Sequence, residues 1–342
     1  MIAGEGGEGK SPITSPEQPT RTPANTGIAR NRNGPFRRND TVPTSSVRRE
    51  ARGGLFRREG YARTVSLYRF QEPIPLLTAP VLIAAFDGWI DAAGAATACA
   101  NHVAEGGRVV ASFDVDSLND YRARRPVLDV VDGVLARMQW PDIVLRHVEI
   151  GGRDLLVLVG PEPDYKWKQL GDDVLELARR LGVVEWISLG AIPAAVPHTR
   201  AVPVLATAST DASLRDGEQQ GPGGILRVPA AALSALEMTV AAAGIPAIGY
   251  YAQVPHYIGA SAYAPASLAL LQHLERRLSV TIPLGTLGDD ALAQRERLDA
   301  AISEDDDSRE YLERLEALAS EDRIPSGDEI ASEIERYLKE QA

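Results

Sequence analysis

The 342-residue sequence has one cysteine, Cys99, and no apolar run as long as the roughly 18 residues that a membrane helix needs. A lone cysteine excludes an internal disulfide and a thiolate metal cluster, so we expect Cys99 to fill space in the core. The first thirty residues lack the charged and then apolar pattern of a signal peptide. These absences together predict a cytoplasmic protein with no membrane span.

The common catalytic signatures are also missing. The sequence has no GxxxxGK[ST] phosphate loop, no GxSxG nucleophile turn, no HExxH motif and no paired cysteines. The spacing of its five histidines does not match a metal site. We therefore expect no cofactor and no metal, and the sequence favours a protein without enzymatic activity while leaving an enzyme open.

Charge is unevenly distributed along the chain, whose formal net charge is -11. Residues 1–60 carry 11 basic and 6 acidic side chains, whereas residues 286–342 carry 18 acidic and 7 basic ones. Because phosphate binding needs a cationic surface, the acidic body argues against nucleic acid as a ligand of the core. The first 60 residues lack apolar periodicity, which predicts a disordered basic tail. Its arginine pairs leave RNA, acidic lipid or the protein's own acidic end open as targets, beside the plainer interpretation of a dispensable extension.

Apolar strands alternate with helices over residues 61–284, which we predict to form one α/β core domain. The predicted strands are 81–86, 108–113, 143–150, 155–159, 184–189, 202–208 and 245–251. The predicted helices are 91–105, 165–181, 211–219, 229–243 and 265–278. Nearly continuous apolar strands indicate a mostly parallel sheet that is covered on both faces. A hairpin at Gly151 and Gly152 adds an antiparallel element, so the predicted sheet is mixed.

Three short amphipathic helices are predicted after Pro283, over 289–302, 307–319 and 326–339. Short helices of this kind need a surface to pack on. We therefore expect residues 285–342 to form an acidic helical extension that packs on the core or on a neighbouring subunit.

Polar side chains follow the predicted strands, where open α/β sheets bind their ligands. After strand 81–86, Asp87 and Trp89 either line a cleft or belong to a turn in which Asp91 caps the next helix. After strand 108–113, Asp116, Tyr121 and Arg122 either bind an anion or pair with nearby charges.

Three further groups follow later strands. After strand 155–159, Glu162 and Trp167 are candidates to face a pocket, while the intervening Asp164 is a candidate helix cap. After strand 184–189 comes the trio His198, Thr199 and Arg200, in which the histidine titrates near neutrality and the arginine orients anions. His256 and Tyr257 follow strand 245–251, and the sequence leaves open whether the two histidines meet. The predicted ligand-binding cleft is lined by Asp87, Trp89, Asp116, Tyr121, Arg122, Glu162, Trp167, His198, Thr199, Arg200, His256 and Tyr257.

Four of these loop segments are distinctive as sequences. They are FDGWIDAAG at 86–94, GPEP at 160–163 followed by Trp167, GAIPAAVPHTR at 190–200 and VPHY at 254–257. Together they resemble the proteasome assembly chaperone 2 family in its actinobacterial form. The resemblance implies a three-layer core similar to purine nucleoside phosphorylases and peptidyl-tRNA hydrolases. It also implies homo-oligomers, as trimers, in which the C-terminal helices cover a cleft.

The resemblance transfers function less completely than fold. Archaeal and eukaryotic relatives assist proteasome assembly, often through a C-terminal hydrophobic-Tyr-X motif, whereas Tyr337 of this chain is followed by five further residues. The family brings no established catalytic residues. Two hypotheses follow: a non-enzymatic, chaperone-like interaction protein with proteasome subunits as candidate partners, and a small-molecule-binding protein or hydrolase/transferase that uses the predicted cleft.

Overall fold

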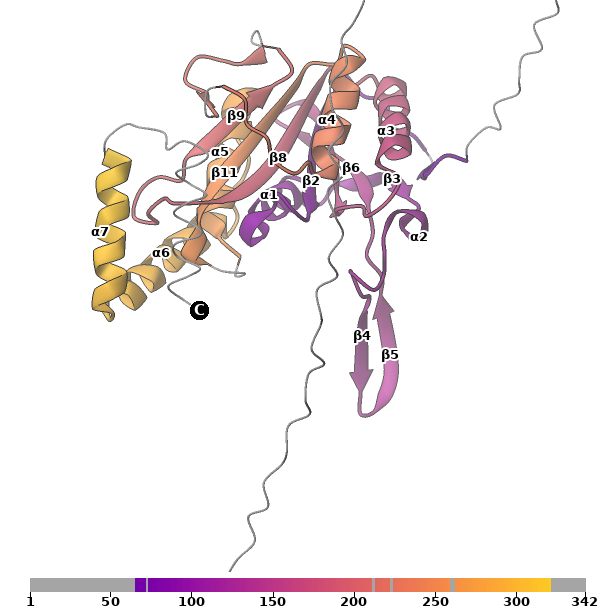
Figure 1. Ribbon diagram of the computed structural model, residues 1–342. Helices are drawn as coiled ribbons and strands as arrows, with labels where there is room; N and C mark the ends of the chain where they lie inside the picture. The colour runs from indigo at the N-terminus through magenta and orange to yellow at the C-terminus, as the bar shows by residue number, and fades with distance from the viewer. Residues whose placement is uncertain (1–64, 72, 211–212, 222–223, 259–261, 321–342) are drawn as a thin grey trace, which may run out of the picture. The chain divides into compact units, whose positions relative to one another are not determined.

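The computed structural model describes residues 65–71, 73–210, 213–221, 224–258 and 262–320 (Figure 1). The chain divides into two units, 1–60 and 61–342, and all of the described residues belong to the second. The predicted disordered tail and the predicted helix 326–339 lie outside the described residues.

Nine strands of the described residues form one mixed sheet with the order β1-β3-β6-β7-β2-β8-β11-β9-β10. The strands are β1 (Tyr68–Phe70), β2 (Val81–Asp87), β3 (Arg108–Phe113), β6 (Val144–Ile150), β7 (Arg153–Pro161), β8 (Glu185–Ala194), β9 (Val204–Ala208), β10 (Gln219–Gln220) and β11 (Ala247–Pro255). The central strands β7, β2, β8 and β11 run parallel, and β6 and β9 flank them antiparallel. The carboxyl ends of the four central strands therefore meet at one edge of the sheet.

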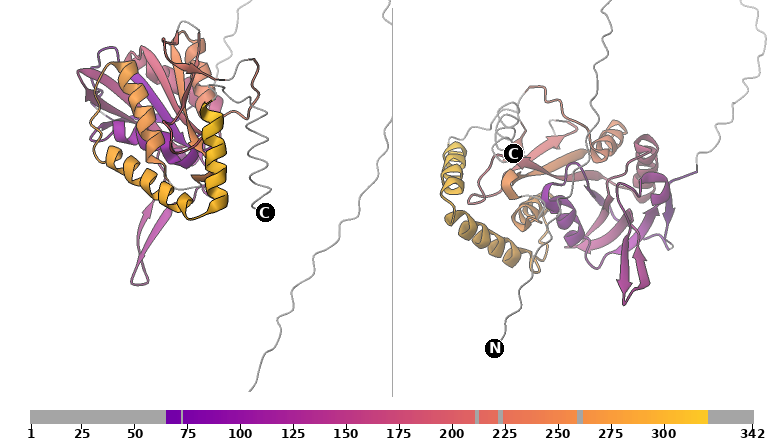
Figure 2. Two further views of the ribbon diagram at one scale, coloured as in Figure 1. Left: turned by 90° about the vertical axis from the view of Figure 1, so that its left-hand side faces the viewer. Right: turned by 60° about the horizontal axis from the view of Figure 1, so that its bottom comes forward.

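Helices cover both faces of this sheet, which confirms the predicted three-layer α/β architecture (Figure 2). The helices are α1 (Ala95–Val103), α2 (Val115–Leu118), α3 (Trp167–Leu181), α4 (Ala232–Ala242), α5 (Ala264–Leu278), α6 (Leu287–Ser303) and α7 (Asp306–Ser320). Apolar side chains of α1 and α5 pack into one core, and those of α3 and α4 pack into the other. Cys99 lies on α1 and is fully buried, as expected.

Two predictions about connections need refinement. Strand β3 runs in the same direction as β2, as predicted, but the hairpin of β6 and β7 lies between them in the sheet. The predicted helix 211–219 is wrong for its described part, where residues 213–218 contain a turn and 219–220 form β10 beside β9. The reason is Gly217, whose positive φ of 85° turns the chain, and the N–H of Glu218 closes the turn on the carbonyl of Arg215.

A second, two-stranded sheet was not predicted and projects away from the main sheet (Figure 1). It consists of β4 (Val127–Val131) and β5 (Val134–Gln139), and we call it the β4–β5 arm. Asp132 and Gly133 connect its strands with φ values of 51° and 80°, the geometry of a tight hairpin turn. Every residue of both strands is exposed, so the arm presents its apolar side chains to the surroundings.

The helices α6 and α7 lie against the core end that carries β8 and β11 (Figure 2). Leu315 of α7 is buried, as expected for the apolar side of an amphipathic helix. Of the helices in the described ranges, none is both long and apolar enough to cross a membrane.

Candidate functional site

The twelve predicted cleft residues fall into two clusters along the edge formed by the central strands. The first, which we call the β2–β7 cluster, contains Asp87, Trp89, Asp116, Tyr121, Arg122, Glu162 and Trp167. The second, which we call the histidine cluster, contains His198, Thr199, Arg200, His256 and Tyr257. Hydrogen bonds of the first cluster connect loops of the core, whereas those of the second reach helices α6 and α7.

Glu162 is the central connector of the β2–β7 cluster. Its Oε2 accepts the backbone N–H of Trp89 at 2.8 Å, and its Oε1 accepts the N–H of Ala232 at 2.7 Å, where α4 begins. A Cβ at Gly88 would lie only 2.2 Å from Oε2, so this position needs glycine. Both carboxylate oxygens of Glu162 are thus engaged in holding the loop after β2 and the start of α4 in place.

Gly94 occupies the N-cap position of helix α1, and Asp91 binds the first turn of the helix from three residues earlier, so its role resembles the expected cap without being the N-cap residue. Its Oδ1 accepts the backbone N–H groups of Ala96 at 2.7 Å and Thr97 at 3.3 Å, in the first turn of the helix. Burial raises the pKa of Asp91, and these hydrogen bonds act in the opposite direction. The side chain of Trp89, by contrast, is 65% exposed and points away from the core.

The charged residues after β3 pair with one another. Arg122 contacts Asp120 at 3.0 Å and, together with its backbone N–H, lowers the pKa of that carboxyl to about 2. Tyr121 donates its hydroxyl proton to Asp116, and this hydrogen bond raises the pKa of Tyr121 to about 12. Of the two interpretations of this segment, the geometry favours local pairing.

The segment before α3 differs from the prediction at one residue. Asp164 does not cap the helix, because Lys166 occupies the N-cap position and the Asp164 carboxylate accepts the backbone N–H of Asp120 at 2.7 Å. The backbone N–H of Asp164 donates to the carbonyl of Leu118, so the backbone of Asp164 is also bound to the end of α2 and not to helix α3. The indole N–H of Trp167 donates to the carbonyl of Pro163 at 2.6 Å, so its polar atom is engaged as well.

In the histidine cluster, His198 is buried and its polar atoms have partners on two sides. The Tyr257 hydroxyl oxygen lies 2.8 Å from the His198 backbone nitrogen, whose N–H it accepts, and 2.8 Å from Nδ1. On the other side of the ring, Nε2 lies 3.1 Å from Oδ1 of Asp299 on α6. Burial lowers the pKa of His198, which outweighs the opposite effect of Asp299, so the neutral ring is favoured.

His256 also contacts Tyr257, and the ring centroids of these two residues are 5.6 Å apart. Its Nδ1 is 3.1 Å from the carbonyl oxygen of Ala194, and its Nε2 is 3.0 Å from the Tyr311 hydroxyl on α7. Burial also lowers the pKa of His256. The two histidines therefore lie in one cluster with Tyr257 between them.

Helices α6 and α7 close over this cluster through further contacts. The hydroxyl of Thr199 donates to Glu316, and the backbone carbonyl of Thr199 accepts a hydrogen bond from Arg295. Arg200 extends to the end of α7, with Nη2 at 3.4 Å from Oγ of Ser320. As a result, the ring nitrogens of both histidines are bound to groups of the protein itself.

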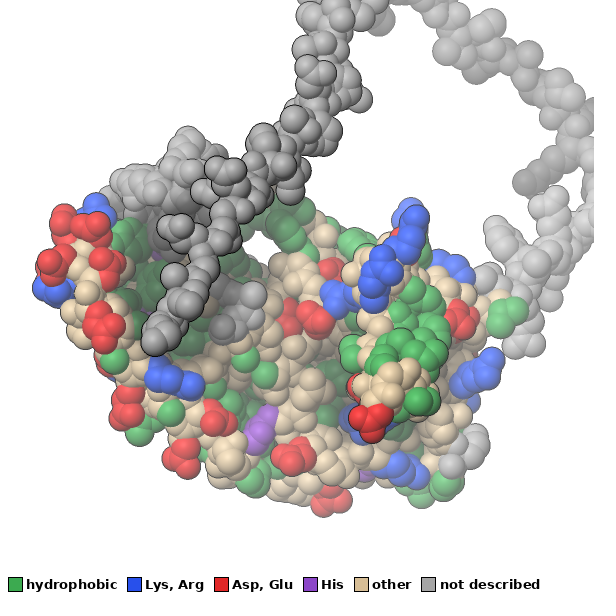
Figure 3. All heavy atoms as spheres, turned by 90° about the horizontal axis from the view of Figure 1, so that it is seen from below, with side chains coloured by type: hydrophobic (Ala, Val, Ile, Leu, Met, Phe, Trp, Pro, Cys, Tyr) green, Lys and Arg blue, Asp and Glu red, His purple; other side chains and the backbone are tan. Residues whose placement is uncertain are grey.

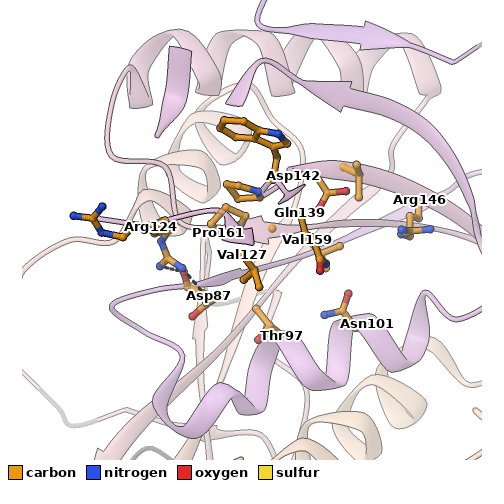
Figure 4. Close-up of a pocket in the computed structure, with 15 residues that line it drawn as sticks. Asp87, Thr97, Asn101, Arg124, Val127, Gln139, Asp142, Arg146, Val159 and Pro161 are labelled. Carbon is orange, nitrogen blue, oxygen red and sulfur yellow. Dashed lines mark hydrogen bonds and ion pairs between the residues drawn. The ribbon is translucent and has the colours of Figure 1, made fainter. Parts of the chain in front are cut away.

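A hollow of about 640 Å³ lies beside the β2–β7 cluster, and of the twelve predicted residues Asp87 lines it (Figure 4). One side is formed by Arg124, which pairs with Asp87 at 2.6 Å. Arg146 and Asn101 lie on the other side (Figure 4). Within the described residues, no group of three or more His, Cys, Asp or Glu side chains is placed to hold a metal ion.

The sequence interpretation missed both this hollow and the β4–β5 arm beside it. The Asp132-Gly133 pair between two Val-rich segments was a hairpin signal that could have identified the arm. No comparable signal indicated that Arg146 lines the hollow, because its position depends on the pairing of β6 with β3 and β7.

Comparisons with known proteins agree with this architecture. The model of the PAC2 family matches residues 85–302. A Mycobacterium tuberculosis protein of unknown function, Rv2714, is 31% identical, with a TM-score of 0.71 over 75% of this chain and 90% of that one. Among curated protein sequences, none matches significantly.

Two further solved structures resemble the chain over 68% of its length and 99% of theirs. One is the Mycobacterium tuberculosis proteasome-assembly chaperone homologue Rv2125, at 34% identity and a TM-score of 0.62. The other is a PAC2 family protein from Streptomyces avermitilis, at 35% identity and a TM-score of 0.61. The family match and these neighbours confirm the resemblance of the loop motifs, and the chain belongs to the PAC2 family, in its actinobacterial branch.

Proposed function

We propose that this protein is a non-enzymatic interaction protein, similar to proteasome assembly chaperones, that works in the cytoplasm as a homo-oligomer, specifically a trimer. The observation that carries this proposal is the exposed apolar surface of the β4–β5 arm (Figure 3). The chaperone part is supported by the 34% identical neighbour, which is a proteasome-assembly chaperone homologue.

The strand register of the arm separates its two faces. Leu128 pairs with Met138 and Val130 pairs with Leu135, so one face carries only apolar side chains. On the other face, the Asp129 and Arg137 pair lies among valines. The large apolar side chains of the arm are between 42% and 71% exposed, and they are Val127, Leu128, Val130, Val131, Val134, Leu135, Met138 and the adjoining Trp140.

A second copy of the chain is the occupant that best fits this surface. An isolated two-stranded hairpin is marginally stable in water, so the arm needs a partner whenever the protein is in solution. A second copy of the chain is present wherever the protein itself is present, so it can always cover the arm. Eight half-exposed side chains of this size present several hundred Å², on the order of the roughly 800 Å² that each partner buries in a stable interface.

The histidine cluster supports a role without catalysis. A general base needs a ring nitrogen that can reach a substrate. In His198 both ring nitrogens contact Tyr257 and Asp299, and in His256 they contact Ala194 and Tyr311. These contacts fasten α6 and α7 to the core, which is a structural task.

The oligomer is tested by native mass spectrometry of the full chain and two variants. Leu135→Glu places a charge on the apolar face of the arm, and we expect it to convert trimers into monomers. Met238→Glu is the matched control, because Met238 is 74% exposed on α4 and lies outside the arm. A monomeric parent protein, or a Leu135→Glu variant that stays trimeric, would refute the assignment of the arm.

The chaperone part is tested separately by mixing the purified protein with purified proteasome α-subunits of its own host. We expect a complex whose mass contains both proteins. Trimers that fail to bind any α-subunit would refute the proteasome connection and leave the oligomer standing. A second candidate function, binding of a small molecule, is favoured by the hollow beside β2 and β7.

A further inference from the structure

The hollow of about 640 Å³ lies at the ends of two neighbouring strands whose following helices pack on opposite faces of the sheet. Strands β2 and β7 are adjacent and parallel, yet α1 follows β2 on one face and α3 follows β7 on the other. Their carboxyl ends therefore diverge into opposite layers. In open α/β sheets this kind of position forms a crevice in which ligands bind.

Arg146 is the distinctive group in this hollow. It is half-buried on β6, and the one hydrogen bond of its side chain in the described part of the chain is a long contact of 3.4 Å from Nη1 to the carbonyl of Gly107. No carboxylate within the described ranges forms an ion pair with it, whereas Arg124 on the opposite side is neutralised by Asp87. A partly buried guanidinium without a counter-charge is stabilised by an oxyanion, which it can bind through two N–H groups.

The other residues of the lining also suit an oxyanion that is joined to an apolar group. Asn101 on α1 lies on the same side as Arg146 and offers an amide N–H (Figure 4). Val127 and Val159 contribute apolar surface, from the base of the arm and from β7. The lining contains three arginines and two aspartates, which gives a formal charge of +1.

We propose that this hollow binds a small organic oxyanion, in which a carboxylate or phosphate group is joined to an apolar body. Arg146 and Asn101 contact the oxyanion, and Val127 and Val159 contact the apolar body. This proposal rests on the second candidate function named above. The site is formed by residues of one chain, and two of them, Val127 and Trp140, also belong to the apolar surface of the arm.

The test uses phenyl phosphate as the ligand, with inorganic phosphate and phenol as its two halves, in calorimetric titrations of the full chain. We expect phenyl phosphate to bind more tightly than either half, because it satisfies the charged and the apolar parts of the hollow together. Absence of phenyl phosphate binding up to about 10 mM would overturn the proposal. One charge-assisted contact together with apolar burial should give a Kd below this concentration.

Two variants locate the binding. Arg146→Gln removes the guanidinium, and we expect the Kd for phenyl phosphate to rise at least tenfold. Asn101→Tyr fills the hollow from an exposed helix position and should abolish binding while the fold is retained. Arg153→Gln is the matched control, because Arg153 is exposed at the opposite end of the same hairpin. Equal affinities of all three variants and the parent would show that the phenyl phosphate binds elsewhere.

Discussion

Replacing Tyr257 by phenylalanine removes one oxygen on which two polar groups of a buried histidine depend. The Tyr257 hydroxyl lies 2.8 Å from the backbone N–H nitrogen of His198 and 2.8 Å from its Nδ1, and His198 itself is 2% exposed. Each buried polar group that loses its partner costs about 1 to 3 kcal/mol, so the variant, which leaves two such groups, should lose about 2 to 6 kcal/mol of unfolding free energy. For a domain of this size, in which each kcal/mol shifts the Tm by about 2 to 4 °C, that loss corresponds to a Tm lower by about 4 to 24 °C.

Urea unfolding followed by circular dichroism measures this loss directly, with scanning calorimetry for the Tm. Tyr121→Phe is the control, because its hydroxyl forms a hydrogen bond to Asp116 at an exposed position. An exposed hydrogen bond contributes little net free energy, so the control should lose less than about 1 kcal/mol. Equal losses in the two variants would show that the Tyr257 hydroxyl does not satisfy buried groups, and the reasoning would fail.

Three further predictions follow from burial and close packing. Because burial lowers the pKa of His198 and His256 in the folded state, the unfolded chain binds more protons, and urea unfolding should show stability lost as the pH falls below about 6.5; stability that rises over this range would contradict it. Gly88→Ala places a Cβ 2.2 Å from a carboxylate oxygen and should cost about 1 to 3 kcal/mol by urea unfolding. Gly221→Ala, with open space at that position, should be neutral, and equal costs would refute the clash. Cys99 is fully buried and its thiol pKa is raised by burial, so a thiol reagent should modify it in denaturant and leave it intact in the native protein; rapid native modification would contradict its burial.

Elements whose signals are local were predictable from the sequence. The apolar segment at Val81–Asp87 became a strand buried on both faces, because nearly every residue of it can be covered. The Gly151 and Gly152 pair formed the predicted turn, with φ values of 58° and 76°. Both cases depend on a few adjacent residues, so no distant contact could change the outcome.

Other features depend on contacts between distant parts of the chain. The helix-cap prediction for Asp164 failed because the backbone of Asp120, 44 positions away, binds its carboxylate instead. His198 and His256 were both identified, but their meeting depends on the pairing of β8 with β11. The residue that covers His198, Asp299, comes from a helix 101 positions further along the chain. No pattern within a short window indicates such a partner.

The two clusters differ in how their polar groups are paired, because different segments lie at the ends of their strands. Beyond β8 and β11, helices α6 and α7 supply Asp299 and Tyr311 to the histidine rings, so the ring nitrogens have partners within the protein. At the ends of β2 and β7 lies the base of the β4–β5 arm, which connects α2 to β6 and projects outward, and Arg146 lies beside a hollow there. A residue that is satisfied by its own chain has no free energy to gain from a ligand, whereas an arginine without a counter-charge does. The proposed ligand binding therefore belongs at the β2–β7 end of the sheet, where two of the four loop motifs, 86–94 and 160–163, also lie.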